Sequence, residues 1–273
     1  MTPHTFYAVF SFIFGAVVGS FLNVVIIRLP RGDSIVSPRS KCPECGCLIR
    51  WYDNIPIFSY FALGGRCRDC GSPFSIRYPL VELTTALIFL GLYLNVGITP
   101  ELGVLFVLCG ALIAVFWIDI DHMIIPDAIT YGLTPMGLVA ATAGILPDMT
   151  WKSSLVGIVL GALALYIPAL AYEFIRGVEG LGGGDVKLLA MLGSFLGPVG
   201  VFFVLLVSSL VGSVAGVIGM AVGKAGSATP IPFGPFLVVG GLLYVFAGPA
   251  IIAYVFGVPP GSLVNFLLGW DNL

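Results

Sequence analysis

This sequence contains few charged residues. Only 10% of its 273 residues are charged, and it has two histidines. A soluble domain usually carries about a quarter charged residues, so this chain has too little charge to cover a water-facing surface. With 58% hydrophobic residues and a mean hydropathy of +1.07, the composition excludes a soluble globular protein and predicts a polytopic membrane protein.

Basic residues are scarce outside one stretch of the chain. Eight of the twelve lie between residues 28 and 77. No other segment offers a basic face, so we expect no nucleic-acid partner. By the positive-inside rule, the same asymmetry places this loop in the cytoplasm and the N-terminus outside. The apolar run that follows the uncharged first residues is too long for a signal-peptide core, so we expect an uncleaved first helix.

Eight apolar segments alternate with polar turns, and we interpret them as about eight transmembrane helices of an all-α fold. A bilayer crossing needs about 20 apolar residues. The predicted helices are residues 6–27, 80–96, 103–118, 128–146, 153–174, 186–197, 199–222 and 233–256. Residues 186–197 are short for a crossing, and such a segment can thin the bilayer or dip from a loop at depth. In this topology, the polar loops 119–127 and 176–185 face the cytoplasm, and the lipid bilayer surrounds the rest.

Four of the six cysteines form two CxxC pairs, Cys42 with Cys45 and Cys67 with Cys70, each followed by glycine. Glycine can take the positive φ of a tight turn around a metal. Two such pairs match a structural zinc site with four thiolate ligands, although residues 46–66 make a separation just longer than usual. A loop of about 50 residues is too small for an ample core, so a metal would stabilise it.

The alternative for these cysteines is two disulfides or a redox-active dithiol. Either requires an oxidising compartment, whereas the charge pattern places the loop in the cytosol. We expect Cys47 and Cys109 to be unligated.

Two acidic residues lie at the cytoplasmic ends of predicted helices. Asp185 follows Gly182, Gly183 and Gly184, and Asp119 directly follows the apolar run 103–118. A carboxylate at the edge of a hydrophobic segment is costly and is therefore a functional-site hypothesis. Two carboxylates within a few ångströms cannot both ionise easily, so they can serve as acid and base on one water. That chemistry hydrolyses a peptide without a covalent intermediate.

The residues around this pair have simpler interpretations. Asp121 and Asp127 are expected to be solvated helix caps. The three glycines are expected to let a peptide backbone approach and to hold Asp185 on an irregular helix entry. For Lys187 we expect pairing with lipid phosphate, or else an influence on the proton balance of the acids. His122 is interpreted as an interfacial residue.

The ordered set of motifs resembles the bacterial type IV prepilin leader peptidases, a bifunctional family that also has N-methyltransferase activity. The motifs are both CxxC pairs, the glycine–aspartate motif and residues 19–30, 77–83, 118–127 and 232–236. The resemblance implies a GxGD-type aspartic endopeptidase of the bacterial inner membrane, with Asp119 and Asp185 as its catalytic acids. It also implies type IV prepilins and type II secretion pseudopilins as substrates. Their basic leaders lie in the cytosol ahead of an apolar helix that usually begins with Phe, and the freed amine is methylated with S-adenosylmethionine.

The methyl-donor site is not assigned by the sequence. The glycine motif does not follow a strand, so it is no dinucleotide-binding fingerprint. The polar candidates are Asn23, Arg28, Glu44 and Glu82. Among them, Glu82 has the highest free-energy cost, because it lies within a membrane segment. The alternative to a role in methyl transfer is that Glu82 pairs with Arg77 or Arg28 to support folding.

We therefore expect three parts: a first transmembrane helix (1–28), a small cytoplasmic four-cysteine zinc domain associated with methyl transfer (29–78) and a transmembrane aspartic peptidase domain (79–273). Three alternatives stay open at this point. They are a GxGD peptidase for other signal sequences without methylation, a membrane dithiol oxidoreductase, and a non-enzymatic scaffold of a secretion apparatus whose acids are only helix caps.

Overall fold

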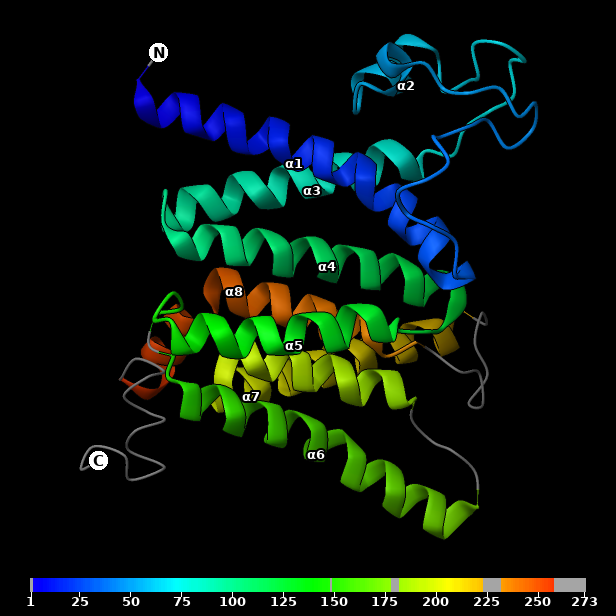
Figure 1. Ribbon diagram of the computed structural model, residues 1–273. Helices are drawn as coiled ribbons and strands as arrows, with labels where there is room; N and C mark the ends of the chain where they lie inside the picture. Colours follow the sequence, from blue (N-terminus) through cyan, green and yellow to red (C-terminus); the bar gives the residue numbers. More distant parts are fainter. Residues whose placement is uncertain (1, 148, 178–181, 223–231, 258–273) are drawn as a thin grey trace. The chain divides into compact units, whose positions relative to one another are not determined.

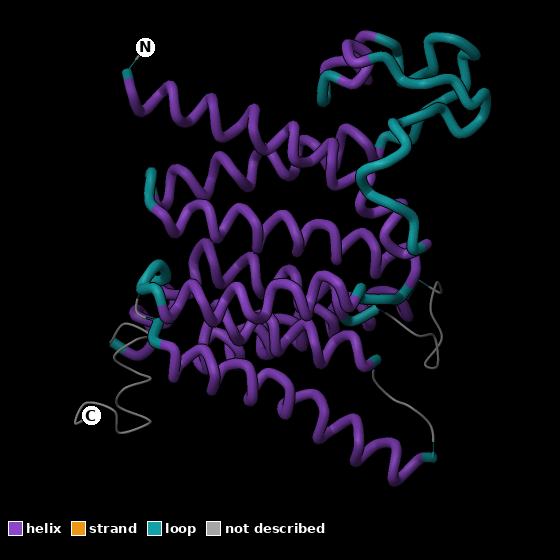
Figure 2. The backbone as a smooth tube through the Cα atoms, in the orientation of Figure 1, coloured by secondary structure: helices purple, strands orange, loops and turns teal. Residues whose placement is uncertain are grey.

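The computed structural model describes residues 2–147, 149–177, 182–222 and 232–257. Within these ranges the regular structure is helical, and the only β-type pairings are two isolated bridges in the cysteine-containing loop. Figure 2 shows the contrast between the helices and that long irregular loop. The predicted all-α class is confirmed. The chain divides into two compact units, Met1–Ile118 and Asp119–Leu273, which are described separately below.

In the first unit, α1 (Pro3–Arg28) packs along α3 (Arg77–Val96), as Figure 1 shows. Two glycines one turn apart on α1 make this close approach possible. A Cβ on Gly15 would lie 2.7 Å from the Cα of Ala86, and one on Gly19 would lie 2.6 Å from the Cα of Glu82. Small residues allow such contacts between helices in lipid. The helix α4 (Pro100–His122) passes from the first unit into the second after residue 118.

The loop between α1 and α3 holds only short helical turns: η1 (Leu29–Arg31), η2 (Trp51–Asn54) and α2 (Phe58–Ala62). Its two CxxC motifs have the same backbone arrangement. The bridge between Lys41 and Leu48 flanks the first motif, and the bridge between Arg66 and Pro73 flanks the second. This part of the chain therefore contains two equivalent turns rather than an ordinary hydrophobic core.

In the second unit, α7 (Gly183–Ala221) is the central helix. It packs against α5 (Asp127–Thr142), α6 (Trp151–Arg176) and α8 (Gly234–Phe256). Glycines bring α6 and α7 together, because a Cβ on Gly161 would lie 2.5 Å from the carbonyl oxygen of Leu189. The backbone of Gly197 (φ 68°, ψ −176°) breaks α7 into two helices.

Each of the eight predicted segments corresponds to a helix or to one of the two halves of α7. Among the residues that the structure describes, six helices are long and apolar enough to cross a membrane, namely α1, α3, α4, α6, α7 and α8. The protein is thus a multi-pass membrane protein, as predicted. The predicted inner loop 119–127 is wrong in its extent, because α4 continues to His122 and α5 begins at Asp127. The turn 147–152, between the predicted helices 128–146 and 153–174, includes residue 148, and the predicted loop 176–185 includes residues 178–181. These residues lie outside the described part of the chain.

Candidate active site and metal centre

Asp119 lies in the last turn of α4, and its residue is only 4% exposed. The backbone N–H of Gly234 donates a hydrogen bond to its carboxylate. Gly234 is the first residue of α8, so the N-terminal end of that helix, with its partial positive charge, faces the acid. The glycine is also required sterically, because a Cβ there would lie 2.5 Å from Asp119 Oδ2.

Asp185 is the third residue of α7 and is 8% exposed. The helix begins at Gly183, with Gly182 as the preceding cap residue in an extended conformation. The predicted irregular entry around Asp185 is therefore wrong. A first-turn acid is stabilised by the unpaired N–H groups at the N-terminal end of the helix, which explains how a buried carboxylate is tolerated here. Asp185 interacts electrostatically with Asp119, so the structure brings the two predicted acids into one site.

Ile125, in the link between α4 and α5, packs beneath this site. A Cβ on Gly184 would lie 3.0 Å from the Cβ of Ile125, and one on Gly234 would lie 3.1 Å from its Cδ1. The beginnings of α7 and α8 thus meet the end of α4 around one buried side chain. By contrast, Gly183 has open space where its Cβ would stand. Gly182 and Gly183 are exposed, so the accessible backbone that the sequence suggested for all three glycines is present at the first two.

Lys187 has a protein partner that the sequence did not predict. Its ammonium donates a 2.7 Å hydrogen bond to Asp127 and lies 5.2 Å from the ring centroid of Tyr131. The basic side chain thus joins the first turns of α7 and α5 rather than the pair of acids. Asp121, His122 and Asp127 are exposed.

The second candidate site is a cluster of four cysteines in the loop of the first unit. The Sγ atoms of Cys42, Cys45, Cys67 and Cys70 all lie within 4.8 Å of one another. Two pairs that cross between the motifs, Cys42–Cys70 and Cys45–Cys67, are 3.8 Å and 4.0 Å apart. Tetrahedral zinc with bonds of about 2.3 Å places its sulfur ligands about 3.8 Å apart, so the cluster fits that metal.

The backbone and the Ser72 hydroxyl prepare two of these sulfurs, those of Cys42 and Cys70, for a metal. Gly46 and Gly71 have φ of 72° and 73°, as predicted for the residues after each motif. The backbone N–H of Cys45 and then the Ser72 hydroxyl lower the pKa of Cys42 to about 6. Metals bind the thiolate form.

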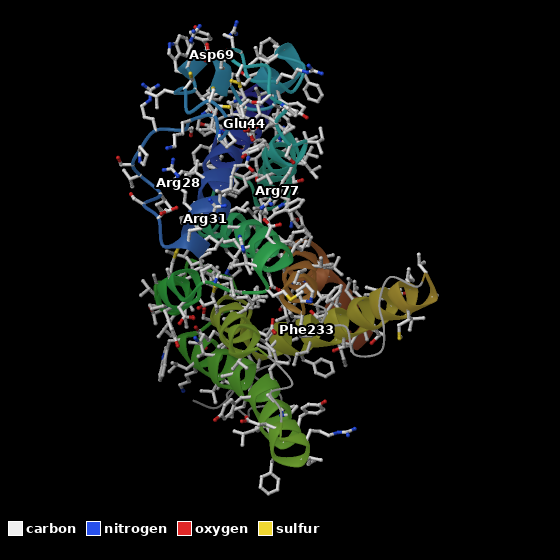
Figure 3. The ribbon with its side chains drawn as sticks, turned by 90° about the vertical axis from the view of Figure 1, so that its right-hand side faces the viewer. Arg28, Arg31, Glu44, Asp69, Arg77 and Phe233 are labelled. Carbon is white, nitrogen blue, oxygen red and sulfur yellow. The ribbon has the colours of Figure 1, made fainter. Side chains whose placement is uncertain are left out.

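The cysteine-containing loop also carries acids inside its two CxxC motifs. Figure 3 shows Glu44 and Asp69 in this loop, with Arg28 at the end of α1 and Arg31 in η1. Arg28 donates to the carbonyl of Ser34 at 3.0 Å, and Glu44 is exposed.

Glu82 and Asn23 connect the first two long helices and the loop. The carboxylate of Glu82 accepts a 2.6 Å hydrogen bond from the backbone N–H of Ile57 and a further one from the Ser20 side chain. The predicted pairing of Glu82 with Arg77 or Arg28 is therefore wrong. The Asn23 side-chain amide donates to the Tyr78 carbonyl at 3.1 Å.

Gly234, Ile125, Ser20 and Ile57 were not identified from the sequence as site residues. Gly234 had a signal, because Pro235 directly after it is typical of a helix start. For Ile57 no sequence signal exists, since its role is a backbone hydrogen bond from a loop to a helix.

These features define a class: a multi-pass membrane protein that has two buried carboxylates at the ends of two helices and a four-cysteine cluster. The comparisons with known proteins identify the family. A profile described as "Bacterial Peptidase A24 N-terminal domain" matches residues 13–96, and one described as "Type IV leader peptidase family" matches residues 106–217.

Three curated relatives illustrate the similarity. The chain is 38% identical over 264 residues to the "Prepilin leader peptidase/N-methyltransferase" of Pseudomonas aeruginosa, covering 88% of this chain and 90% of that protein. It is 43% identical over 226 residues to the protein of the same name from Myxococcus xanthus, covering 82% and 66%. It is 40% identical over 253 residues to the "Type 4 prepilin-like proteins leader peptide-processing enzyme" of Escherichia coli, covering 85% and 91%. No solved structure matches the chain. The chain belongs to the type IV leader peptidase family.

Proposed function

We propose that this chain is a membrane-embedded aspartic endopeptidase and N-methyltransferase. It removes the leader from type IV prepilins and type II secretion pseudopilins and methylates the new N-terminal residue, usually Phe. The observation that carries the peptidase half is the meeting of two buried acids, Asp119 and Asp185, from separate helices. The names of relatives that match along most of their length support both halves.

In the peptidase reaction, Asp119 and Asp185 share one proton, because two neighbouring carboxylates cannot both ionise easily. The ionised acid takes a proton from the attacking water, and the protonated acid donates to the oxygen of the scissile carbonyl. The Gly234 N–H holds Asp119 in place during this exchange. The open backbone at Gly183 gives an extended leader a place to approach the acids.

The topology proposal follows from the basic residues. We place the chain in the bacterial inner membrane, with its N-terminus outside and with the acids and the cysteine-containing loop at the cytoplasmic face. Residues 29–78 then form the zinc domain that serves methyl transfer, next to the first helix (1–28), and residues 79–273 contain the peptidase. Zinc is proposed as a structural ion held by the four clustered cysteines, and S-adenosylmethionine as the methyl donor.

The alternatives have less support. A scaffold with acids as simple caps does not explain why Asp119 and Asp185 are both buried. A dithiol oxidoreductase would use two cysteines of one CxxC motif, whereas the sulfurs of all four cysteines lie within 4.8 Å of one another. Thiol modification separates these readings: release of zinc supports a metal site, and a reversible disulfide midpoint supports redox chemistry.

Two adjacent glycines give a matched test of how the acids are positioned. Replacing Gly184 with Ala should lower the rate of leader cleavage about tenfold, because its Cβ would press on Ile125. Replacing Gly183 with Ala should leave the rate near the wild-type value, because its Cβ meets nothing. Both changes raise helix propensity by a similar amount, so the difference isolates the packing. The reverse order of effects would show that the motif serves substrate approach instead.

The rate of leader cleavage should depend on pH as a bell-shaped curve. Both limbs report the pair, because the reaction needs one ionised and one protonated carboxylate. Single-turnover cleavage of a purified prepilin in detergent, from acid to mildly alkaline pH, measures this profile. A flat profile would contradict a shared proton.

A further inference from the structure

The first unit contains an open cavity of about 510 Å³. Its walls come from the end of α1, the beginning of α3 and the cysteine-containing loop, all within residues 20–82. Sites for small molecules commonly measure about 300–1,000 Å³. Asn23, Arg28 and Glu82 line this cavity, whereas Glu44 does not.

We propose that this cavity binds S-adenosylmethionine and that Glu82 receives the amine to be methylated. The inference rests on the proposed methyltransferase function and assigns it a location. The cavity lies in the same unit as the four-cysteine cluster, and Cys42, Cys47 and Cys67 form part of its wall.

The walls of the cavity match the chemistry of this ligand. Tyr60, Phe74 and Tyr78 line it, and aromatic rings pack well against a flat base. Phe74 and Tyr78 already lie edge to face, with ring centroids 6.2 Å apart. Arg28 lies at the end of α1 and offers a guanidinium to a carboxylate.

Glu82 is the acid of the cavity that lies within a membrane helix. It is 8% exposed, and among the described residues it forms no ion pair. Its partners are neutral donors, the Ile57 N–H and the Ser20 side chain. A buried acid in an apolar helix is a functional-site hypothesis by default. A neutral hydrogen-bond shell leaves its charge for a cationic group of a substrate.

The donor to Glu82 comes from a strained turn. Ile57 has φ 64° and ψ −54°, and the N–H of Phe58 donates to the carbonyl of Pro56 at 2.6 Å around it. This is a γ-turn with positive φ, which is rare and costly for a β-branched residue. Such strain persists only where the surroundings determine it, and it concentrates at functional sites. Here the turn directs the Ile57 N–H at one carboxylate oxygen, so it fixes the position of that carboxylate.

The position of Glu82 suits the substrate of the second reaction. A mature pilin begins with an apolar helix, so its new N-terminus reaches the enzyme at the level of the membrane. Glu82 accepts the proton that the α-ammonium loses on becoming a free amine. The amine nitrogen then forms a bond to the methyl carbon while the carbon–sulfur bond breaks and leaves its electron pair on sulfur. The proton finally passes from Glu82 to water.

Two pairs of variants test the assignment. Leu63 lines the cavity, and Phe61 lies on the same turn outside it. Leu63→Trp should therefore weaken binding of radiolabelled S-adenosylmethionine at least tenfold. Phe61→Trp should leave this binding unchanged. Glu82→Gln should bind the donor within about twofold of wild type but methylate a cleaved pilin about 10²-fold more slowly, as for loss of a general base. Glu101→Gln, at an acid of the first unit that lies outside the cavity, should behave as wild type.

Zinc content and resistance of residues 29–78 to protease are the control for folding of each variant, because the acids that cleave the leader lie in the second unit. A direct measurement adds to it: ultraviolet crosslinking of the donor to the wild-type protein should label peptides within residues 20–82. Labelling confined to other residues, or full binding by a correctly folded Leu63→Trp, would overturn the cavity assignment. Wild-type methylation rates in Glu82→Gln would overturn the role of Glu82. If the wild-type protein cleaves prepilin but neither binds the donor nor methylates, the proposed methyltransferase function itself fails.

Discussion

Replacing Asp119 or Asp185 with Asn should each reduce leader cleavage by at least about 10²–10⁴-fold, the range that a general acid or base contributes. Asn has nearly the same shape as Asp but can neither accept nor deliver the shared proton. The two losses should not add in the double variant, because the acids act as one unit. Quantitative cleavage of a purified prepilin, followed by the change in its mass, measures the effect.

Asp121→Asn is the matched control for this experiment. Asp121 lies two residues after Asp119 on the same helix but is exposed, so this variant should cleave at nearly the wild-type rate. Methylation of an already cleaved pilin should survive in Asp119→Asn and Asp185→Asn, because both acids belong to the second unit. Near wild-type cleavage by either variant would show that the two residues are not a catalytic pair.

The sequence predicted this pair because an acidic residue at the edge of an apolar run can be recognised from the sequence alone. Asp119 ends an unbroken apolar run, and Asp185 follows the glycines at the start of another. Topology then put the two acids on one side of the membrane, and in the structure Asp185 interacts electrostatically with Asp119. The same reasoning failed for the helix boundaries, because α4 continues past Asp119 through a stretch that looks polar.

Contacts between segments far apart in the sequence could not be predicted in this way. Lys187 binds Asp127, and the Ile57 N–H binds Glu82. In each case the partner depends on which helix ends meet, and the second case also depends on a strained turn that no residue preference indicates. The close approach of α1 to α3 had a visible signal in Gly15 and Gly19, which have the small-residue spacing of membrane helix pairs.

Removing the metal from the four-cysteine cluster should abolish methylation and spare cleavage. A structural zinc site contributes about 10–16 kcal/mol to folding in small zinc domains, and this loop has little other regular structure. Without the ion the two CxxC turns would separate, and the Ile57 turn that holds Glu82 would lose its support. The acids Asp119 and Asp185 lie in the other unit, so they should keep their geometry.

Cys67→Ser tests this expectation, with Cys47→Ser as its control. Cys67 is buried within the cluster, whereas Cys47 is exposed and lies outside it. The first variant should lose its zinc on metal analysis, become open to protease within residues 29–78 and lose methylation, while the second should keep its zinc and its resistance to protease. Because the cysteine-containing loop contributes most of the cavity wall, binding of S-adenosylmethionine should fall together with zinc content. A zinc-free Cys67→Ser protein that still methylates would show that the metal supports neither the cavity nor Glu82. A loss of cleavage as large as the loss of methylation would show that the two units depend on each other for folding.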